Sequence, residues 1–220
     1  IDIVDVYLTL LQDQIGGYYN PEDKTMNTIL VSGGELGDDL PFLEEIIYAH
    51  EFVHALQDQN FDLQAIGLSD EGLETLGTDQ ILALQALIEG DATLVMTLYT
   101  EKVLEENPMA AFSLLGGSLT SGSLTMPEGT PEILTRELLF PYDLGATFVT
   151  AIYQDGGWEA VDAAFGNLPQ STEQIFHPEK YLSGEMPIPV ELADATAALG
   201  DDWTLMLEET MGEFYLRAYL

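Results

Sequence analysis

The alternation of apolar and polar positions predicts a mainly helical chain with one small β element near the N-terminus. Residues 2–14 have apolar side chains near helical spacing, whereas extended runs around 17–19 and 26–32 flank a turn at "NPEDK". Pro41 is expected to open a helix that runs through "FLEEIIYAHEFVHALQDQ", because proline is favoured in the first turn of a helix. We therefore expect an α+β fold, mainly α, in which a small hairpin packs on this helix.

The remainder of the chain is predicted as helices joined by loops. Short helical pieces at 61–77 lead to Thr78, the predicted N-cap of a long helix that ends before Pro108. Residues 113–129 are rich in Ser, Gly and Thr and predict a long loop. Pro131 is expected at the first position of the next helix. Gly and Pro separate the later predicted helices, which are "PYDLGATFVTAIYQ", "WEAVDAAF", "STEQIF" and "WTLMLEETMGEFYLRAYL".

The length of 220 residues suits a single domain with two lobes, which we place at 1–112 and 113–220. Apolar residues make up 46% of the chain, so a core can form and the disordered class is excluded. Acidic residues interrupt the longest apolar helix, so we expect no membrane insertion in this segment. The chain begins at Ile1 rather than Met, which suggests a fragment or a processed form whose signal peptide, if any, was lost.

Charge is the most unusual bulk property of the chain. Asp and Glu number 39 against five Lys and Arg, and the net charge of −34 disfavours binding to nucleic acid or an anionic membrane. The acids are scattered through every segment, which favours a surface adapted to molar salt, where the Debye length is about 3 Å. A dedicated acidic surface for cations or basic partners is the alternative. Because cysteine is absent, any transition-metal site must use imidazole and carboxylate ligands.

The most specific chemical signal is the pentapeptide "HEFVH" within the helix predicted after Pro41. His50 and His54 are four residues apart, so both project from one helix face and can reach one zinc ion at about 2.0–2.1 Å. Glu51 lies about 100° around the helix, where it can accept a proton from a water activated by the metal. The alternative is a partly buried helix that carries two ordinary histidines.

A catalytic zinc site needs a third protein ligand and one open position. Glu89, in "ALIEGDA", interrupts an apolar run of the long helix, and a buried carboxylate needs a cation or a hydrogen-bond partner. Gly90 costs about 1 kcal/mol of helix stability relative to alanine, but permits close approach of a neighbouring helix or metal. Asp91 is the rival ligand, since the two carboxylates cannot point the same way. A solvated position for Glu89 is the other alternative.

The pair "HEFVHALQD" and "EGDA", the latter beginning 35 residues after His54, resembles the gluzincin branch of the zincin metallopeptidases. Over most of its length the chain is also similar to uncharacterised haloarchaeal HExxH proteins. The resemblance implies a zinc cofactor bound by His50, His54 and Glu89, with Glu51 as the general base. It also implies a zincin-like fold in which an edge strand above the active-site helix holds an extended peptide. The hairpin at 17–32 is the candidate for that strand.

Peptidases of this family usually stabilise the oxyanion with a tyrosine or histidine from the C-terminal lobe. The candidates here are His177 in "IFHPEKY" and Tyr142 in "FPYDLG", with Tyr181 and Arg136 also available. His177 could instead cap or pack a helix, Tyr142 could belong to the core, and Arg136 could pair with an acid.

Ligating imidazoles normally donate their second N–H to a carboxylate or carbonyl group, which orients the ring. Asp58, one turn after His54, and Asp91 are the candidates for this supporting role. Asp58 could equally be a solvated acid at the end of the helix.

Together these residues predict a zinc metallopeptidase that hydrolyses peptide or protein substrates at high salt and forms one catalytic domain. The alternatives are a catalytically inactive zincin-fold module for surface interaction or metal binding, and a structural metal-binding protein. Peptidases are often exported, so the expected location is extracellular or at the cell surface, with the cytoplasm as the alternative. The sequence leaves the oligomeric state open.

Overall fold

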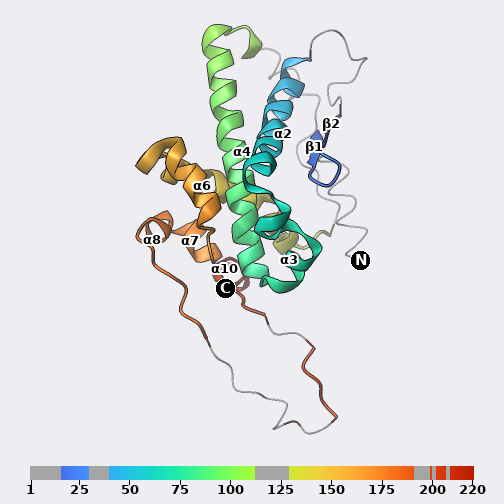
Figure 1. Ribbon diagram of the computed structural model, residues 1–220, viewed down its shortest axis with the longest axis vertical. Coiled ribbons are helices and arrows are strands. Elements are labelled where there is room, and N and C mark those ends of the chain that lie inside the picture. The colour runs from blue at the N-terminus through green and yellow to red at the C-terminus, as the bar shows by residue number, and fades with distance from the viewer. Residues whose placement is uncertain (1–15, 30–39, 112–128, 191–198, 200–201, 207–208) are drawn as a thin grey trace.

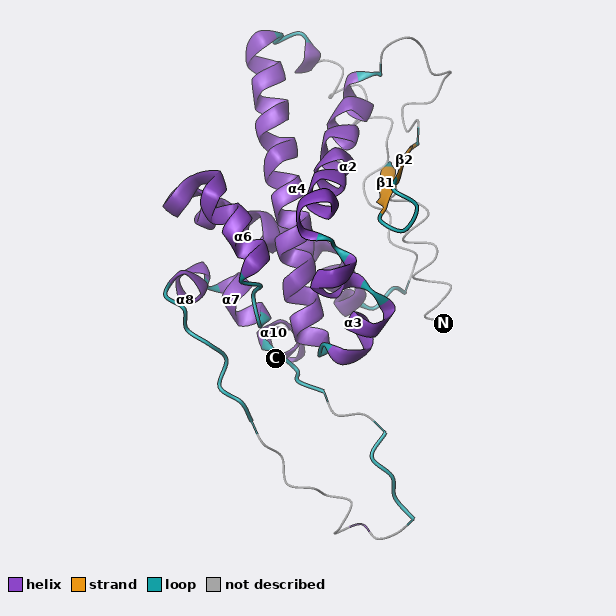
Figure 2. Cartoon of the chain, in the orientation of Figure 1, coloured by secondary structure: helices purple, strands orange, loops and turns teal. Residues whose placement is uncertain are grey.

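The computed structural model shows a mainly helical chain with a small antiparallel sheet near its N-terminus (Figures 1 and 2). The helix predicted at 2–14 and almost all of the loop predicted at 113–129 lie outside the described residues. The structure describes residues 16–29, 40–111, 129–190, 199, 202–206 and 209–220.

The predicted hairpin is present. Strand β1 (Gly17–Asn20) pairs antiparallel with β2 (Thr25–Thr28), and the chain reverses between them at the predicted "NPEDK" turn. The N–H of Ile29 donates to the carbonyl of Gly16 at 2.9 Å, which extends the pairing by one residue. β2 ends at Thr28, and residues 30–32 of the predicted strand lie outside the described part of the chain.

The helices that carry the two predicted zinc motifs form as expected. Helix α2 (Phe42–Phe61) begins after Pro41, whose extended backbone makes it the N-cap residue. The π-helix η1 (Gln64–Leu68) and helix α3 (Asp70–Thr75) are the short pieces predicted in the connection. Helix α4 (Thr78–Glu106) has Gly77 rather than Thr78 as its N-cap, so the predicted boundary was wrong by one residue.

Helix α6 (Glu132–Gly166) covers the stretch in which three helices were predicted, and it corrects the first of the two breaks between them. Pro131 is the N-cap residue rather than the first helical residue, and Pro141 lies buried inside the helix without ending it. The backbone departs from helical geometry only at Gly156 and Gly157. Gly157 has a φ of 66°, a conformation that glycine adopts without steric cost. The non-helical backbone at these two glycines confirms the predicted break before "WEAVDAAF", whereas no break separates the first two predicted helices.

The C-terminal segment corrects a second prediction. Helices α7 (Thr172–Phe176) and α8 (Pro178–Leu182) follow α6, but in the described part of "WTLMLEETMGEFYLRAYL" only α10 (Glu213–Tyr219) is helical. Residues 203–206 and 209–212 are not helical, and Trp203, Leu205 and Met206 are exposed. Short helices depend on burial of an apolar face, and only α10 has it, through Phe214.

Helix α4 lies between α2 and α6, and α4 and α6 together contribute most of the core (Figure 1). Gly90 of α4 faces the backbone of Gly145 in α6 so closely that a Cβ atom on either glycine would overlap the other helix. The close approach of a neighbouring helix predicted at Gly90 is therefore present, and the neighbour is α6. Because Gly90 is adjacent to Glu89, the contact with α6 also determines where Glu89 lies relative to α2.

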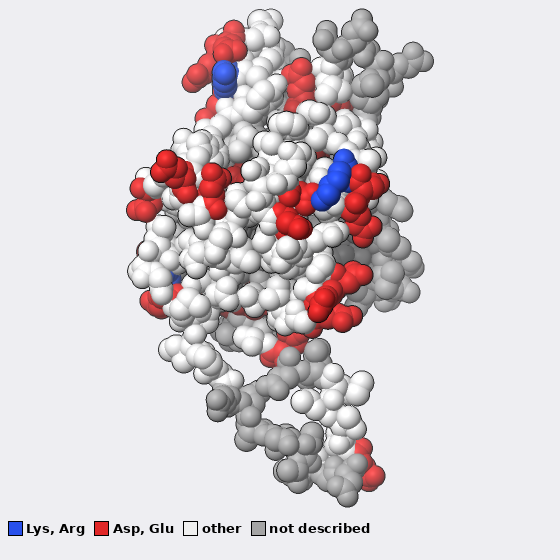
Figure 3. Space-filling model, viewed as in Figure 1, with Lys and Arg blue, Asp and Glu red and all other residues white. Residues whose placement is uncertain are grey.

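Among the described residues, α4 is the one helix long and apolar enough to cross a membrane. About 56% of its most apolar stretch is buried inside the fold. Figure 3 shows acidic side chains spread over several elements of the visible face, with few basic ones among them.

Candidate metal centre

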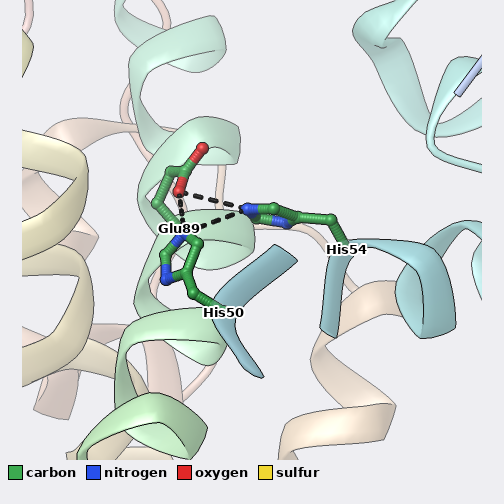
Figure 4. Close-up of side chains that lie close together, drawn as sticks. All are labelled: His50, His54 and Glu89. Atoms are coloured by element: carbon green, nitrogen blue, oxygen red, sulfur yellow. Dashed lines mark hydrogen bonds and ion pairs between the residues drawn. The ribbon is translucent and has the colours of Figure 1, made fainter. Parts of the chain in front are cut away.

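Helices α2 and α4 bring the two motif histidines and Glu89 together (Figure 4). Nε2 of His50 lies 3.0 Å from Oε2 of Glu89, and Nε2 of His54 lies 3.3 Å from the same oxygen. The two Nε2 atoms are 3.2 Å apart. The side chains of His50, His54 and Glu89 are only 10%, 12% and 23% exposed. One possible ligand atom from each residue thus occupies a corner of a small, largely buried triangle.

The size of this triangle matches tetrahedral coordination of a single metal ion. Ligand atoms bound to zinc at about 2.0–2.1 Å in tetrahedral geometry lie about 3.3 Å from one another. The observed separations are 3.0, 3.2 and 3.3 Å. Two imidazole nitrogens with one carboxylate oxygen suit zinc and similar transition metals better than calcium or magnesium, which prefer oxygen. Three protein donors leave one tetrahedral position for water or substrate.

Gln57 orients the imidazole of His54 and was missed by the sequence reasoning. Nε2 of Gln57 donates to the carbonyl of Ile88 at 3.0 Å and to Oδ2 of Asp91 at 2.8 Å. Its Oε1 therefore faces Nδ1 of His54, 2.9 Å away, and must accept the Nδ1 proton. This tautomer leaves the lone pair of Nε2 directed at the triangle. The available signal was the position of Gln57, three residues after His54 on the same helix face.

Among the described residues, neither Asp91 nor Asp58 makes the predicted direct hydrogen bond to an imidazole. Asp91 reaches His54 only through Gln57, although it is buried in the same region as Glu89. Asp58 contacts neither imidazole among the described residues; it accepts hydrogen bonds from Tyr19 and Lys24 of the hairpin instead. Nδ1 of His50 is buried and has no hydrogen-bond partner in the described part of the chain.

Tyr142 of α6 lies beside the triangle. Its ring stacks on that of His50, with centroids 6.0 Å apart and planes 28° from parallel. Burial, together with the negative charges of Glu89 and Glu51 and a hydrogen bond to Glu89, raises the pKa of the phenol. Tyr142 therefore keeps its proton and can donate a hydrogen bond, while its exposed fraction of 40% keeps it accessible from solvent.

Glu51 faces the hairpin. Its Oε2 accepts a hydrogen bond from the backbone N–H of Tyr19 at 2.9 Å, and its Cγ packs next to Gly17. No described residue donates a hydrogen bond to Oε1 of Glu51. The glutamate is thus held by one oxygen, beside the imidazoles but outside the triangle of possible ligands.

The same three residues form an ion pair when they hold a proton rather than a metal. Burial opposes the positive charge on His54, but the hydrogen bond to Glu89 and its charge raise the pKa of His54 to about 9. Burial likewise opposes the charge on Glu89, but hydrogen bonds from both histidines lower its pKa to about 2. A metal ion must therefore displace a proton in order to bind at neutral pH.

His177, the other predicted oxyanion donor, is not part of this centre. It lies between α7 and α8, with Nε2 3.1 Å from Oε1 of Glu213 and Nδ1 3.6 Å from Oε1 of Glu179. Arg136 pairs with Glu132 on its own helix. The hydroxyl of Tyr181 donates to the carbonyl of Asn167 at 2.7 Å. These contacts agree with the packing and pairing alternatives weighed for His177 and Arg136.

A cavity of about 540 Å³ lies in the C-terminal half of the structure, between α6, α7 and α10. None of the triangle residues lines it. Each of its two arginines is paired with a glutamate four residues earlier on its own helix, so the charge in the cavity is largely balanced. The lining residues are Arg136, Leu139, Phe140, Asp143, Leu144, Phe176, Phe214, Arg217 and Ala218.

In comparisons with known proteins, no family model, no curated protein and no solved structure matched the chain. The interpretation of the centre therefore depends on its own geometry and chemistry.

Proposed function

We propose that the chain is a zinc-dependent metallopeptidase with a zincin-like fold. The observation that carries the proposal is the triangle of two imidazole nitrogens and one carboxylate oxygen, with separations of 3.0–3.3 Å. The donors come from two packed helices, the tautomer of His54 is set by Gln57, and both a carboxylate and a phenol adjoin the triangle. A metal bound there would be held by His50, His54 and Glu89.

The neighbouring residues have the chemistry that peptide hydrolysis requires. A bound zinc ion supplies Lewis acidity and lowers the pKa of water towards neutrality. Glu51 acts as the general base through Oε1, while the N–H of Tyr19 holds Oε2. Tyr142 keeps its proton near neutral pH and donates a hydrogen bond to the oxyanion that develops on the scissile carbonyl. These roles divide the proton transfer and the charge stabilisation between two side chains.

The surface charge supports an enzyme that works at high salt. The net charge is −34, and acidic side chains are spread over the visible face with too few basic ones to neutralise them (Figure 3). Repulsion among these acids opposes the compact state and weakens as salt shortens the Debye length to about 3 Å at 1 M.

A non-catalytic zincin-fold module is the second candidate. The hydrogen bond between Glu51 and the hairpin favours it, because a glutamate with only a structural role would also be held in this way. In such a module the metal would cross-link α2 and α4 without acting on a substrate.

Zinc content and peptide cleavage together separate the two functions. Purified protein in molar salt is analysed for bound metal and incubated with casein and a broad library of quenched peptides. The peptidase proposal expects one zinc per chain, cleavage by the wild type, and loss of cleavage with retained zinc in Glu51→Gln. Stoichiometric zinc without cleavage by the wild type supports the module, and absence of bound zinc rejects both.

A further inference from the structure

The hairpin is fastened to α2 at two acidic residues that lie on one face of the helix. Glu51 and Asp58 are seven residues apart, which places them two turns from each other on the same side. Tyr19 contacts both: its backbone N–H donates to Oε2 of Glu51 at 2.9 Å, and its hydroxyl donates to Oδ2 of Asp58 at 2.7 Å. Lys24 adds an ion pair to the same oxygen of Asp58 at 2.5 Å.

The pairing of the two strands explains why the amide of Tyr19 is available. Gly16 and Ile29 form a hydrogen-bonded pair, and such pairs alternate along an antiparallel ladder. Tyr19 is three residues further and opposite Met26, so it occupies a non-bonded position. Its N–H therefore points away from β2, where Glu51 accepts it.

Asp58 makes the attachment firm because its carboxylate is buried. Its side chain is only 1% exposed, and a buried carboxylate is costly unless it is paired and hydrogen-bonded. Besides the two groups of the hairpin, the backbone N–H of Leu63 donates to Oδ1 at 3.3 Å. Burial and the hydrogen bond to Asp58 raise the pKa of Tyr19 to about 12, which keeps the phenol a donor.

We propose that Tyr19 is a positioning residue for Glu51, and that Asp58 and Lys24 anchor it. The phenol and the lysine fix the hairpin to α2, so that the N–H of Tyr19 meets one oxygen of Glu51 and leaves the other free to take a proton. The inference rests on the proposed function in so far as Glu51 is the base. It assigns Asp58 to the hairpin anchor rather than to an imidazole.

Adjacent tyrosines provide a matched test. Tyr19→Phe removes the anchor but keeps the backbone N–H, whereas Tyr18→Phe changes an exposed neighbour for which the described residues offer no side-chain hydrogen bond. We expect Tyr19→Phe to lower kcat about 10–100-fold, with KM changed less than about twofold and zinc content unchanged. Tyr18→Phe should match the wild type. A kcat for Tyr19→Phe equal to that of Tyr18→Phe would overturn the proposal.

Lys24→Gln removes the exposed half of the anchor and covers the case in which Tyr19→Phe fails to fold. Its expected effect is a smaller fall in kcat, with KM and zinc content again unchanged. Lys102→Gln, at an exposed position of α4, is the control. Equal kcat values for the two lysine variants would contradict the role of Lys24.

Amide exchange tests the attachment without any catalytic readout. The amides of Gly17 and Tyr19 both occupy non-bonded positions of β1, but only that of Tyr19 has an acceptor among the described residues. In the wild type we expect the Tyr19 amide to exchange at least tenfold more slowly than that of Gly17, after correction for intrinsic rates. Tyr19→Phe and Glu51→Ala should remove most of this protection. Equal exchange of both amides in the wild type would reject the attachment, whereas protected exchange in a protein that cleaves nothing would reject only the proposed function.

Discussion

Nδ1 of His54 lies 2.9 Å from Oε1 of Gln57, and this contact determines which nitrogen of His54 can bind a metal. A carboxylate is a common partner of ligating imidazoles, but here an amide takes that position and the carboxylate of Asp91 orients the amide. The arrangement fixes the tautomer without placing another negative charge directly on the ring. His54 is therefore oriented by a hydrogen-bonded relay, in which the neutral amide of Gln57 contacts the ring and the carboxylate of Asp91 contacts the amide.

This relay predicts that Gln57→Leu weakens zinc binding. Loss of the acceptor allows His54 to adopt the other tautomer, and we expect the zinc affinity to fall about 10–100-fold. The change also leaves the carbonyl of Ile88 and the carboxylate of Asp91 without this donor, which should lower the free energy of unfolding by about 1–3 kcal/mol. Zinc titration below the unfolding temperature checks the first effect. Gln59→Leu, at an exposed position two residues on, is the control and should leave the affinity unchanged.

Removal of the third donor should abolish tight zinc binding. We expect Glu89→Gln to weaken zinc affinity at least 100-fold, because the amide is neutral and a poorer ligand than the carboxylate. Glu101→Gln, at an exposed position of the same helix, should bind zinc like the wild type. A ligand at 100 times its Kd stabilises the fold by about 2.7 kcal/mol, so removal of zinc by a chelator should lower the Tm of the wild type. The Tm of Glu89→Gln should stay unchanged, because this variant binds little zinc. Equal chelator effects on both proteins would exclude Glu89 as a ligand.

The raised pKa of His54 predicts a pH-dependent affinity. With a pKa of about 9 in the metal-free protein, His54 is protonated at pH 7 and must lose that proton to bind zinc. Zinc affinity should therefore rise as pH increases from 7 towards 9. Calorimetric titrations in buffers of different ionisation enthalpy should show the release of about one proton near pH 7. A titration without proton release would contradict the ion pair.

The same ion pair predicts where the metal-free protein is most stable. The pKa of His54 is raised from its usual value of 6.5 to about 9, so its contribution is complete below pH 6.5 and disappears as pH rises towards 9. The pKa of Glu89 is lowered from 4.5 to about 2, so its contribution is complete above pH 4.5 and disappears as pH falls towards 2. Denaturant unfolding with chelator should thus show the largest contribution between pH 4.5 and 6.5, of about 3 kcal/mol. His54→Gln should flatten the change between pH 6.5 and 9.

The contact between α4 and α6 predicts that Gly90 tolerates no side chain. A Cβ atom at Gly90 would meet the backbone of Gly145, which cannot move without separating the helices. We expect Gly90→Ala to lower the free energy of unfolding by about 3 kcal/mol or more, and to displace Glu89 enough to weaken zinc binding. At Gly166 in α6 a Cβ atom meets nothing within 4 Å, so Gly166→Ala should be neutral or slightly stabilising. Equal stability of the two variants by thermal unfolding would contradict the packing.

The acidic surface predicts stabilisation by salt. Raising the salt concentration from 0.1 to 1 M shortens the Debye length from about 10 Å to about 3 Å, which reduces repulsion among the acids. The free energy of unfolding, measured in urea at several NaCl concentrations, should increase over this range. A decrease would show that attractive ion pairs outweigh the repulsion.

The sequence by itself determined the features that depend on local spacing. A separation of four positions places the rings of His50 and His54 on one face of α2, whatever the helix packs against. The interruption of an apolar run marked Glu89, and the glycine beside it marked a close helix contact. The hairpin turn was equally local, because Asn and Pro specify it within a few residues.

Only the tertiary structure decided which distant groups meet. It placed Asp58 in contact with the hairpin, Asp91 next to Gln57 and His177 next to Glu213. It also left Trp203, Leu205 and Met206 exposed and non-helical. Periodicity states which face of an element is apolar, but not which neighbour covers that face. The three possible ligand atoms come together only if α2 and α4 pack with the right separation and axial register. Contacts between residues far apart in the chain set both.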